Sequence, residues 1–206
     1  MKIVLDFDHT LFDTEKFKQA LQGRLAMFGV TVDQFNSNYR IVKEQLGHYD
    51  YQEHLRLLAQ EEELDENDLL LNFNEIVNSA NEFLFPDVLN FLESLKAISK
   101  SELYLLTFGQ DKFQQAKVEA SGIRPYFKEV VDTVDSKLIF FDQNKKLQKA
   151  TFVDNRGKTI DQIKMKYPDV VAIWLKRENT PYDNENCKRM DFQVDSLTEV
   201  LQYINK

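Results

Sequence analysis

Short apolar runs alternate with helical patterns over most of the chain, which is typical of an α/β protein. The first run, residues 2–7, ends in acidic residues and predicts a buried parallel strand. Further strands are predicted at 103–106, 129–134, 151–153, 170–175 and, shorter, near 192–194, and helices at 88–98, 112–120, 159–166 and 197–204. This alternation implies right-handed crossovers and a doubly wound, Rossmann-like parallel sheet.

Residues 14–85 follow a different pattern. Apolar side chains recur there at helical spacing and no convincing strand interrupts them, so we predict a bundle of about four helices. Gly29 and Gly47 are expected helix ends. The chain thus divides into a core of residues 1–13 and 86–206 and an inserted helical cap of residues 14–85. An insert just after the first strand would lie at the carboxyl edge of the sheet, where such folds bind ligands.

Composition and charge narrow the functional classes. The 206 residues carry a formal net charge of -8, which argues against a nucleic-acid binder but allows a small anionic substrate. No stretch approaches the roughly 20 apolar residues of a membrane helix. Acidic residues follow the N-terminus too soon for a secretory signal, and the single Cys187 cannot form an intrachain disulfide. We expect a cytoplasmic protein without membrane partners, as a monomer or weak dimer.

Two carboxylates follow the first strand. Alternate residues of a strand face the same way, so Asp6 and Asp8 can address one site. Carboxylates this close repel each other, which raises one pKa or recruits a cation. One could act as a nucleophile and the other as a general acid and base. The alternative is turn or helix-capping chemistry, for which acidic residues are also common at strand ends.

Two further strand ends carry polar residues. Thr107 follows an apolar strand, and its hydroxyl, with the backbone N–H groups of Phe108 and Gly109, could hold a phosphoryl oxygen at a helix N-terminus. The alternative is a plain N-cap. Asp154 and Asn155 end another apolar strand, where an Asx turn is the alternative to a functional role.

Together these strand ends resemble the haloacid dehalogenase superfamily in type and in order along the chain. Asp6, Asp8 and Thr10 match its DxDxT motif, and Thr107 matches the second motif. Residues 154–160, Asp-Asn-Arg-Gly-Lys-Thr-Ile, are similar to the fourth. The third motif is a single lysine. Lys137 is our assignment, and Lys145, Lys146 and Lys149 are its rivals.

The resemblance implies a mechanism. Asp6 would attack phosphorus to give an aspartyl phosphate, and Asp8 would protonate the leaving oxygen and then activate water. Mg²⁺ would be held by the Asp6 carboxylate, the Asp8 backbone carbonyl and Asp154. Asn155 stands where many relatives have a second acid; its amide could hold a metal-bound water but adds no charge.

The implied substrate is a small phosphorylated metabolite. Thr107 and Lys137 would neutralise charge on its phosphoryl oxygens, with Thr10, Phe108 and Gly109 also at the substrate. Dehalogenases proper lack the second acid of the first motif. Two alternatives stay open: a regulatory protein with weak catalysis, suggested by Asn155, and a receiver-like domain, which the long helical insert disfavours.

Overall fold

One parallel sheet forms the centre of the α/β part of the chain. The structure is a computed structural model that describes residues 1–98, 101–134 and 136–204. Within them, six strands pair in parallel in the order β3-β2-β1-β4-β5-β6. Their bounds are β1 Lys2–Leu5, β2 Glu102–Phe108, β3 Glu129–Thr133, β4 Thr151–Asp154, β5 Val171–Leu175 and β6 Phe192–Val194. The order changes direction between β1 and β4, which is where doubly wound sheets bind ligands.

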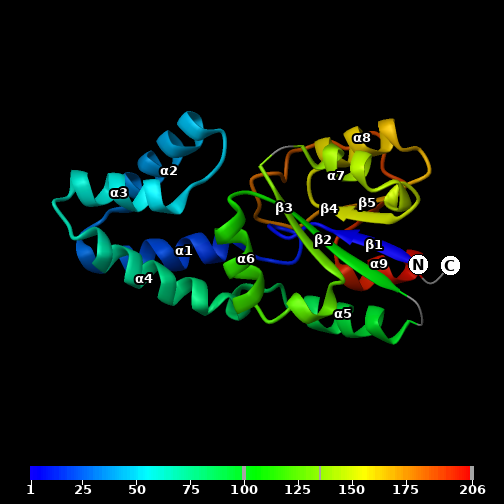
Figure 1. Cartoon of the computed structure of the whole chain (residues 1–206), viewed down its shortest axis with the longest axis horizontal. Coiled ribbons are helices and arrows are strands. Elements are labelled where there is room, and N and C mark those ends of the chain that lie inside the picture. Colours follow the sequence, from blue (N-terminus) through cyan, green and yellow to red (C-terminus); the bar gives the residue numbers. More distant parts are fainter. Residues whose placement is uncertain (99–100, 135, 205–206) are drawn as a thin grey trace. The chain divides into compact units, whose positions relative to one another are not determined.

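Helices cover both faces of this sheet (Figure 1). Those on one face are α7 Lys137–Gln143 and α8 Gly157–Lys166, and those on the other are α5 Val88–Ala97 and α9 Leu197–Ile204. Alternate strand residues serve the two layers: Val4, Phe152 and Trp174 belong to the core cluster that includes α7 and α8 side chains. Short 3-10 turns lie at η3 Arg124–Tyr126 and η4 Lys145–Leu147.

The helical part is built from amphipathic helices with clear start and stop signals. These are α1 Thr14–Leu25, η1 Ala26–Phe28, α2 Val32–Leu46, α3 Tyr51–Glu61, α4 Glu66–Asn78, η2 Ala80–Phe83 and α6 Asp111–Ala120. Thr31 and Gln34 form a capping box at the start of α2, and the side chain of Asp50 caps α3. Gly29 and Gly47 end their helices with φ of 88° and 76°, the left-handed conformation that glycine adopts without strain.

Contacts divide the chain into two compact units. The α/β unit contains Met1–Asp13, Leu84–Phe108 and Ile123–Lys206, and the helical unit contains Thr14–Phe83 and Gly109–Gly122. The segment Gly109–Gly122, which the sequence analysis placed in the core, thus groups with the inserted helices. The reason is aromatic packing, because Phe113 on α6 lies 5.3 Å from Tyr51 and 5.6 Å from Phe73, measured between ring centroids.

The predicted doubly wound parallel sheet is confirmed, and so are the helical pattern of the insert and the two glycine ends. The helix α7 was not predicted, because its seven residues are too few to show a helical period. No helix in the described ranges is long and apolar enough to cross a membrane.

Candidate active site

A tight turn follows β1 and places the first acidic residues. The Phe7 carbonyl accepts from the N–H groups of Thr10, Leu11 and Phe12 at 3.2, 2.8 and 3.0 Å. Phe7, Leu11 and Phe12 are fully buried, so the turn is held by apolar packing on its inner side. His9 adopts a φ of 60°, which this reversal requires. The polar residues of the turn therefore lie at the carboxyl edge of the sheet.

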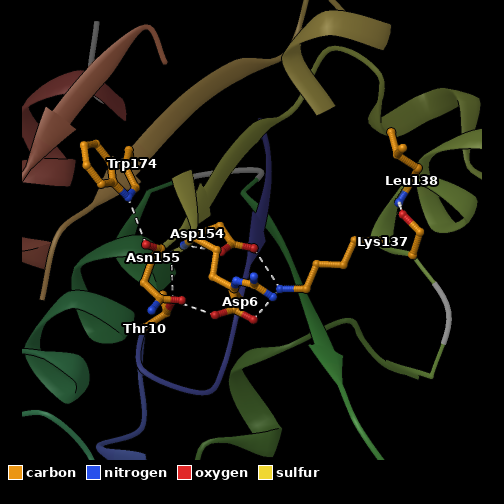
Figure 2. A network of polar contacts seen from close by, with 9 residues as sticks. Asp6, Thr10, Lys137, Leu138, Asp154, Asn155 and Trp174 are labelled. Carbon is orange, nitrogen blue, oxygen red and sulfur yellow. Dashed lines mark hydrogen bonds and ion pairs between the residues drawn. The ribbon is translucent and has the colours of Figure 1, made fainter. Parts of the chain in front are cut away.

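Lys137 joins two carboxylates from neighbouring strand ends. Its Nζ donates to Asp6 Oδ1 and, at 2.8 Å, to Asp154 Oδ2. Figure 2 shows its side chain reaching from the start of α7 to both acids. All three side chains are nearly buried, with exposed fractions of 10%, 7% and 1% for Lys137, Asp6 and Asp154. The rival lysines do not share this position: the side chain of Lys149 is 81% exposed and pairs with Asp169 at 3.7 Å.

The electrostatics of this group are those of two acids sharing one cation. Burial raises the pKa of Asp6 to about 6, and the Asp154 charge adds to that rise, while Lys137 and the Thr10 hydroxyl oppose it. Burial alone would lower the pKa of Lys137, but the carboxylates of Asp154 and Asp6 outweigh it and raise that pKa above its usual range. Lys137 therefore stays protonated.

Thr10 braces the same carboxylate from the other side. Its hydroxyl donates to Asp6 Oδ2 at 2.6 Å and accepts from the backbone N–H of Asn155 at 3.2 Å. Figure 2 shows this chain of contacts from Asn155 through Thr10 to Asp6. Both oxygens of the Asp6 carboxylate thus have a donor, which fixes its orientation. The structure places Thr10 beside the proposed nucleophile, where the expected role at the substrate stays a prediction.

The end of β4 combines a turn with the charge group. Asp154 Oδ1 accepts from the Arg156 N–H at 2.7 Å, which is the Asx turn considered as an alternative, while its other oxygen accepts from Lys137. Asn155 is buried, and its backbone carbonyl accepts from the Trp174 indole N–H at 2.9 Å. The Asn155 side-chain Nδ2 is buried and finds no hydrogen-bond partner in the described structure. Asp154 therefore both forms the Asx turn and belongs to the charged group with Lys137. The Nδ2 of Asn155 is a donor that a ligand could use.

Thr107 is the second-last residue of β2 and is fully buried. It caps no helix. Its Oγ1 has no hydrogen-bond partner among the described residues, and α6 begins later, with Gln110 at its N-cap. An unpaired buried hydroxyl costs free energy, about 1–3 kcal/mol, that a bound ligand could recover. Phe108 next to it is 45% exposed. The N-cap alternative for Thr107 is therefore wrong.

Gly109 belongs to the helical unit by its contacts. Its φ of 147° favours glycine, and an added Cβ would lie 2.5 Å from Gln114 Nε2. This close approach explains why a glycine follows Phe108. Its expected contact with substrate stays a prediction.

Asp8 and Tyr182, from the loop between β5 and β6, are further residues at this edge of the sheet. Asp8 is half-buried and forms an isolated bridge with Phe12. Burial raises the pKa of Tyr182, the charge of Arg156 opposes that rise, and the charges of Asp6 and Asp8 add to it. The Tyr182 ring packs edge-on against His9, with centroids 5.4 Å apart. The charges of both acids of the first motif thus act on the same phenol, and the expected role of Asp8 stays a prediction.

The sequence analysis missed the contribution of the loop after β5. Arg156, to which it assigned no role, lies with its guanidinium 4.7 Å from the Tyr182 ring centroid and 3.5 Å from Glu185. Arg177 from the same loop bonds the carbonyl of Thr10. The position of the loop after β5 could have indicated its role. The loop leaves the carboxyl end of a predicted strand, at the edge of the sheet that carries the other site residues.

The donor set at this edge fits Mg²⁺. The carboxylates of Asp6 and Asp154 converge on one cationic atom, so both point into the same small space. Mg²⁺ in proteins is bound by one or two carboxylates together with waters and phosphate oxygens. No group of three or more His, Cys, Asp or Glu side chains with metal-binding geometry occurs among residues 1–98, 101–134 and 136–204. A magnesium site here would therefore depend on waters, a backbone carbonyl and substrate for its remaining ligands.

A parallel sheet with acids, a lysine and an unpaired hydroxyl at its carboxyl edge is the arrangement of an α/β enzyme. The family model of haloacid dehalogenase-like hydrolases matches residues 3–155. The chain belongs to this family of hydrolases. No curated protein sequence matches it significantly.

Solved structures share the fold. A haloacid dehalogenase-like hydrolase from Burkholderia xenovorans superposes with a TM-score of 0.78 at 18% identity, over 98% of this chain and 97% of the other. The HAD-hydrolase YfnB from Bacillus subtilis, bound to magnesium, has a TM-score of 0.68 at 14% identity, over 100% and 98%. The L-2-haloacid dehalogenase from Xanthobacter autotrophicus has 0.68 at 16%, over 99% and 98%. At these identities the likeness shows the fold alone.

Proposed function

We propose that the protein hydrolyses a small phosphate monoester with the help of Mg²⁺, through a covalent intermediate on Asp6. The observation that carries this proposal is the buried Asp6 carboxylate, oriented by Lys137 and Thr10, with Asp8 two positions further along the chain. A buried, oriented carboxylate can act as a nucleophile, and a neighbouring one can move the protons of the reaction.

The two half-reactions use Asp6 and Asp8 in turn. An Asp6 oxygen forms a bond to phosphorus while the bond from phosphorus to the ester oxygen breaks, and Asp8 gives its proton to that oxygen. Asp8 then takes a proton from water, whose oxygen attacks phosphorus, and the bond to Asp6 breaks to release inorganic phosphate. Each step moves one phosphoryl group and one proton, so Asp6 and Asp8 return to their starting states.

Other residues would hold the phosphoryl group. Lys137 keeps its positive charge at the Asp6 carboxylate and can neutralise an oxygen of the incoming phosphate. Thr107 has a buried hydroxyl without a partner, and Asn155 has an unpartnered Nδ2. A phosphoryl group presents several acceptor oxygens, which would satisfy such donors. These unpaired donors support an oxyanion ligand over an apolar one.

Asp6, Asp154 and the backbone carbonyl of Asp8 would hold Mg²⁺, with Asn155 in the outer part of the site. The ion would supply charge neutralisation between the carboxylates and the phosphate. Support comes from the convergence of the two carboxylates on one cationic atom.

The second carboxylate favours a phosphate ester over a haloacid as substrate. An alcohol leaves phosphorus readily only when its oxygen receives a proton, whereas a halide ion is a weak base that needs none. Asp8 provides that proton donor beside Asp6. The net charge of -8 fits a small metabolite in the cytoplasm better than a nucleic acid polymer.

A substrate panel tests the proposal. Phosphate monoesters and 2-haloacids are each incubated with the wild-type protein, with and without Mg²⁺, and release of phosphate or halide is measured. We expect magnesium-dependent phosphate release from at least one ester. Asp8→Asn should lower kcat about 10²- to 10⁴-fold, the usual contribution of a proton-transferring side chain.

Asp169→Asn is the matched control, because that carboxylate lies in the same unit but its side chain is 68% exposed and its contact with Lys149 is long, at 3.7 Å. Its activity should match the wild type. Halide release without phosphate release would overturn the proposal, as would full activity of Asp8→Asn on an accepted ester.

A further inference from the structure

A buried arginine just after β5 contacts the turn that follows β1. Arg177 is 9% exposed, and its Nε and Nη2 donate to the backbone carbonyl of Thr10 at 3.3 and 3.1 Å. Its Nη1 and Nη2 also donate to the two carboxylate oxygens of Asp87, at 3.0 and 2.7 Å. One planar guanidinium therefore joins the turn after β1 to the start of α5, entirely within the α/β unit.

The anchor of this arginine is itself fixed. Asp87 Oδ2 accepts from the backbone N–H of Leu197, the first residue of α9, at 2.8 Å. The ring centroid of Phe85 lies 4.2 Å from the Arg177 guanidinium carbon, and the Phe85 N–H donates to the carbonyl of Leu11 at 3.0 Å. The guanidinium is thus held by α5, α9 and an aromatic ring before it reaches Thr10.

A buried ion pair is a poor way to gain stability. Removing two charges from water costs several kcal/mol per ion, and the attraction within a buried pair often does no more than offset that cost. What the bidentate pair supplies is geometry, because a planar fork fixes the direction of its remaining N–H groups. Those groups point at a single backbone atom, the carbonyl oxygen of Thr10.

Thr10 links this anchor to the nucleophile. Its carbonyl is held by Arg177, and its hydroxyl donates to Asp6 Oδ2 at 2.6 Å and accepts from the Asn155 N–H at 3.2 Å. A residue fixed at its carbonyl has little freedom to move its side chain. Displacement of about 1 Å at a reacting group can cost about 100-fold in rate, so a fixed Thr10 matters for the orientation of Asp6.

We propose that Arg177 is a positioning residue: through the Thr10 carbonyl it holds the turn after β1 so that Thr10 orients the Asp6 carboxylate. Arg177 itself contacts none of the reacting groups. Its effect on turnover rests on the proposed function of Asp6, whereas its effect on the turn does not.

The first measurement compares, in steady-state kinetics, two cations that each bond a backbone carbonyl and a carboxylate. Arg177→Met keeps the aliphatic stem and removes every donor, and we expect kcat to fall about 10- to 100-fold with KM changed less than about threefold. Lys164→Met is the control, because Lys164 also bonds carbonyls, of Pro168 and Val170 at 2.9 and 2.6 Å, and an acid, Asp191, away from the site. Its kcat should stay near that of the wild type.

A double-mutant cycle separates positioning from general loosening of the fold. If Arg177 acts through Thr10, then Arg177→Met should lower kcat less than about threefold when Thr10→Val is already present. If the loss in the double variant equals the two single losses combined, the proposal is contradicted. If Arg177→Met does not fold, Arg177→Lys replaces it, since lysine keeps the charge but cannot bond Asp87 and Thr10 with one planar fork.

The second measurement needs no substrate. Hydrogen exchange of the Thr10, Leu11 and Phe12 amides, all of which donate to the Phe7 carbonyl, reports the order of the turn. We expect these amides to exchange at least about tenfold faster in the Arg177 variant than in Lys164→Met. Unchanged exchange would overturn the proposal even in an active enzyme. Faster exchange in a protein without phosphatase activity would support it and refute only the proposed function.

Discussion

The two units bury titratable groups in opposite ways. In the helical unit His54 is fully buried, and both ring nitrogens are bonded: Nε2 lies 3.0 Å from the Phe35 carbonyl and Nδ1 lies 3.0 Å from the Tyr49 hydroxyl. Since a carbonyl only accepts, Nε2 carries the proton and Nδ1 accepts from the tyrosine. Burial lowers the pKa of His54 to about 4, so it is neutral at pH 7.

In the α/β unit the buried titratable groups instead form a charged cluster. Asp6 and Asp154 share a single cation, Lys137, and the Thr107 hydroxyl has no partner in the part of the chain that the structure describes. Complete hydrogen bonding stabilises a fold, whereas unpaired donors and surplus charge stabilise a ligand that is not yet there. The contrast between the neutral His54 and the charged group of Asp6, Lys137 and Asp154 is one reason why we propose the α/β unit as the place of the chemistry.

The largest effect is expected for Lys137→Ala. This change leaves two buried carboxylates without their common cation, so we expect kcat/KM to fall about 100-fold or more. Lys145→Ala and Lys149→Ala serve as controls because they are the rival candidates for the third motif. Initial rates on an accepted ester give the ranking. A greater loss in either control would move the motif downstream.

His54→Ala should do the opposite, by weakening the fold and sparing the chemistry. It leaves the Tyr49 hydroxyl and the Phe35 carbonyl without this partner, at a cost of about 1–3 kcal/mol each in the free energy of unfolding. Urea unfolding measures the loss, and kcat at a temperature where the variant stays folded should lie within about threefold of the wild type. A large loss of kcat with unchanged stability would erase the distinction between the units.

The pH dependence of stability should differ in sign between the two groups. Between the ordinary histidine pKa of 6.5 and about 4, unfolded His54 binds more protons than folded His54, so its contribution to stability is lost as pH falls. Between 3.8 and about 6, folded Asp6 binds more protons than unfolded Asp6, so its contribution is lost as pH rises.

Urea titrations of the metal-free protein across pH 4–7, with His54→Ala and Asp6→Asn beside the wild type, check this. Each variant should remove its own slope, of at most about 1.4 kcal/mol per pH unit. Variants with the slope of the wild type would mean that these residues are not buried as the structure has them.

The smallest effect is expected for Asn155→Asp. A carboxylate in the outer part of a magnesium site adds negative charge and should tighten the binding of Mg²⁺ a few-fold. Activity at limiting magnesium should rise, with little change at saturation. Calorimetric titration of both proteins with Mg²⁺ checks it, and superimposable curves would remove Asn155 from the metal site.

The sheet and the residues at its strand ends could be predicted because their signals are local. A buried strand followed by Asp6 and Asp8 can be recognised from adjacent residues, and the doubly wound parallel sheet follows from the alternation of strands with helices. Lys137 could only be proposed among rivals, because one lysine carries no pattern. The structure separates it from them by two ion pairs, with Asp6 and with Asp154.

What could not be predicted depends on contacts between distant parts of the chain. Arg177 lies 167 positions from Thr10, and nothing near either residue in the sequence indicates that the two bond. The same holds for α6, whose neighbours in sequence are strands while Phe113 packs among aromatic rings of the helical unit. Loop conformation and partner choice follow from the packed fold, which local propensity does not encode.

The most direct test of the account is to trap the intermediate. An accepted phosphate ester is mixed with enzyme and Mg²⁺, the reaction is quenched in acid within one turnover, and peptides are analysed by mass spectrometry. We predict one added phosphoryl group on Asp6, accumulating further in Asp8→Asn if release of the intermediate becomes slow, and absent in Asp6→Asn. A phosphoryl group on any other residue, or rapid phosphate release by Asp6→Asn, would contradict the claim that Asp6 is the nucleophile.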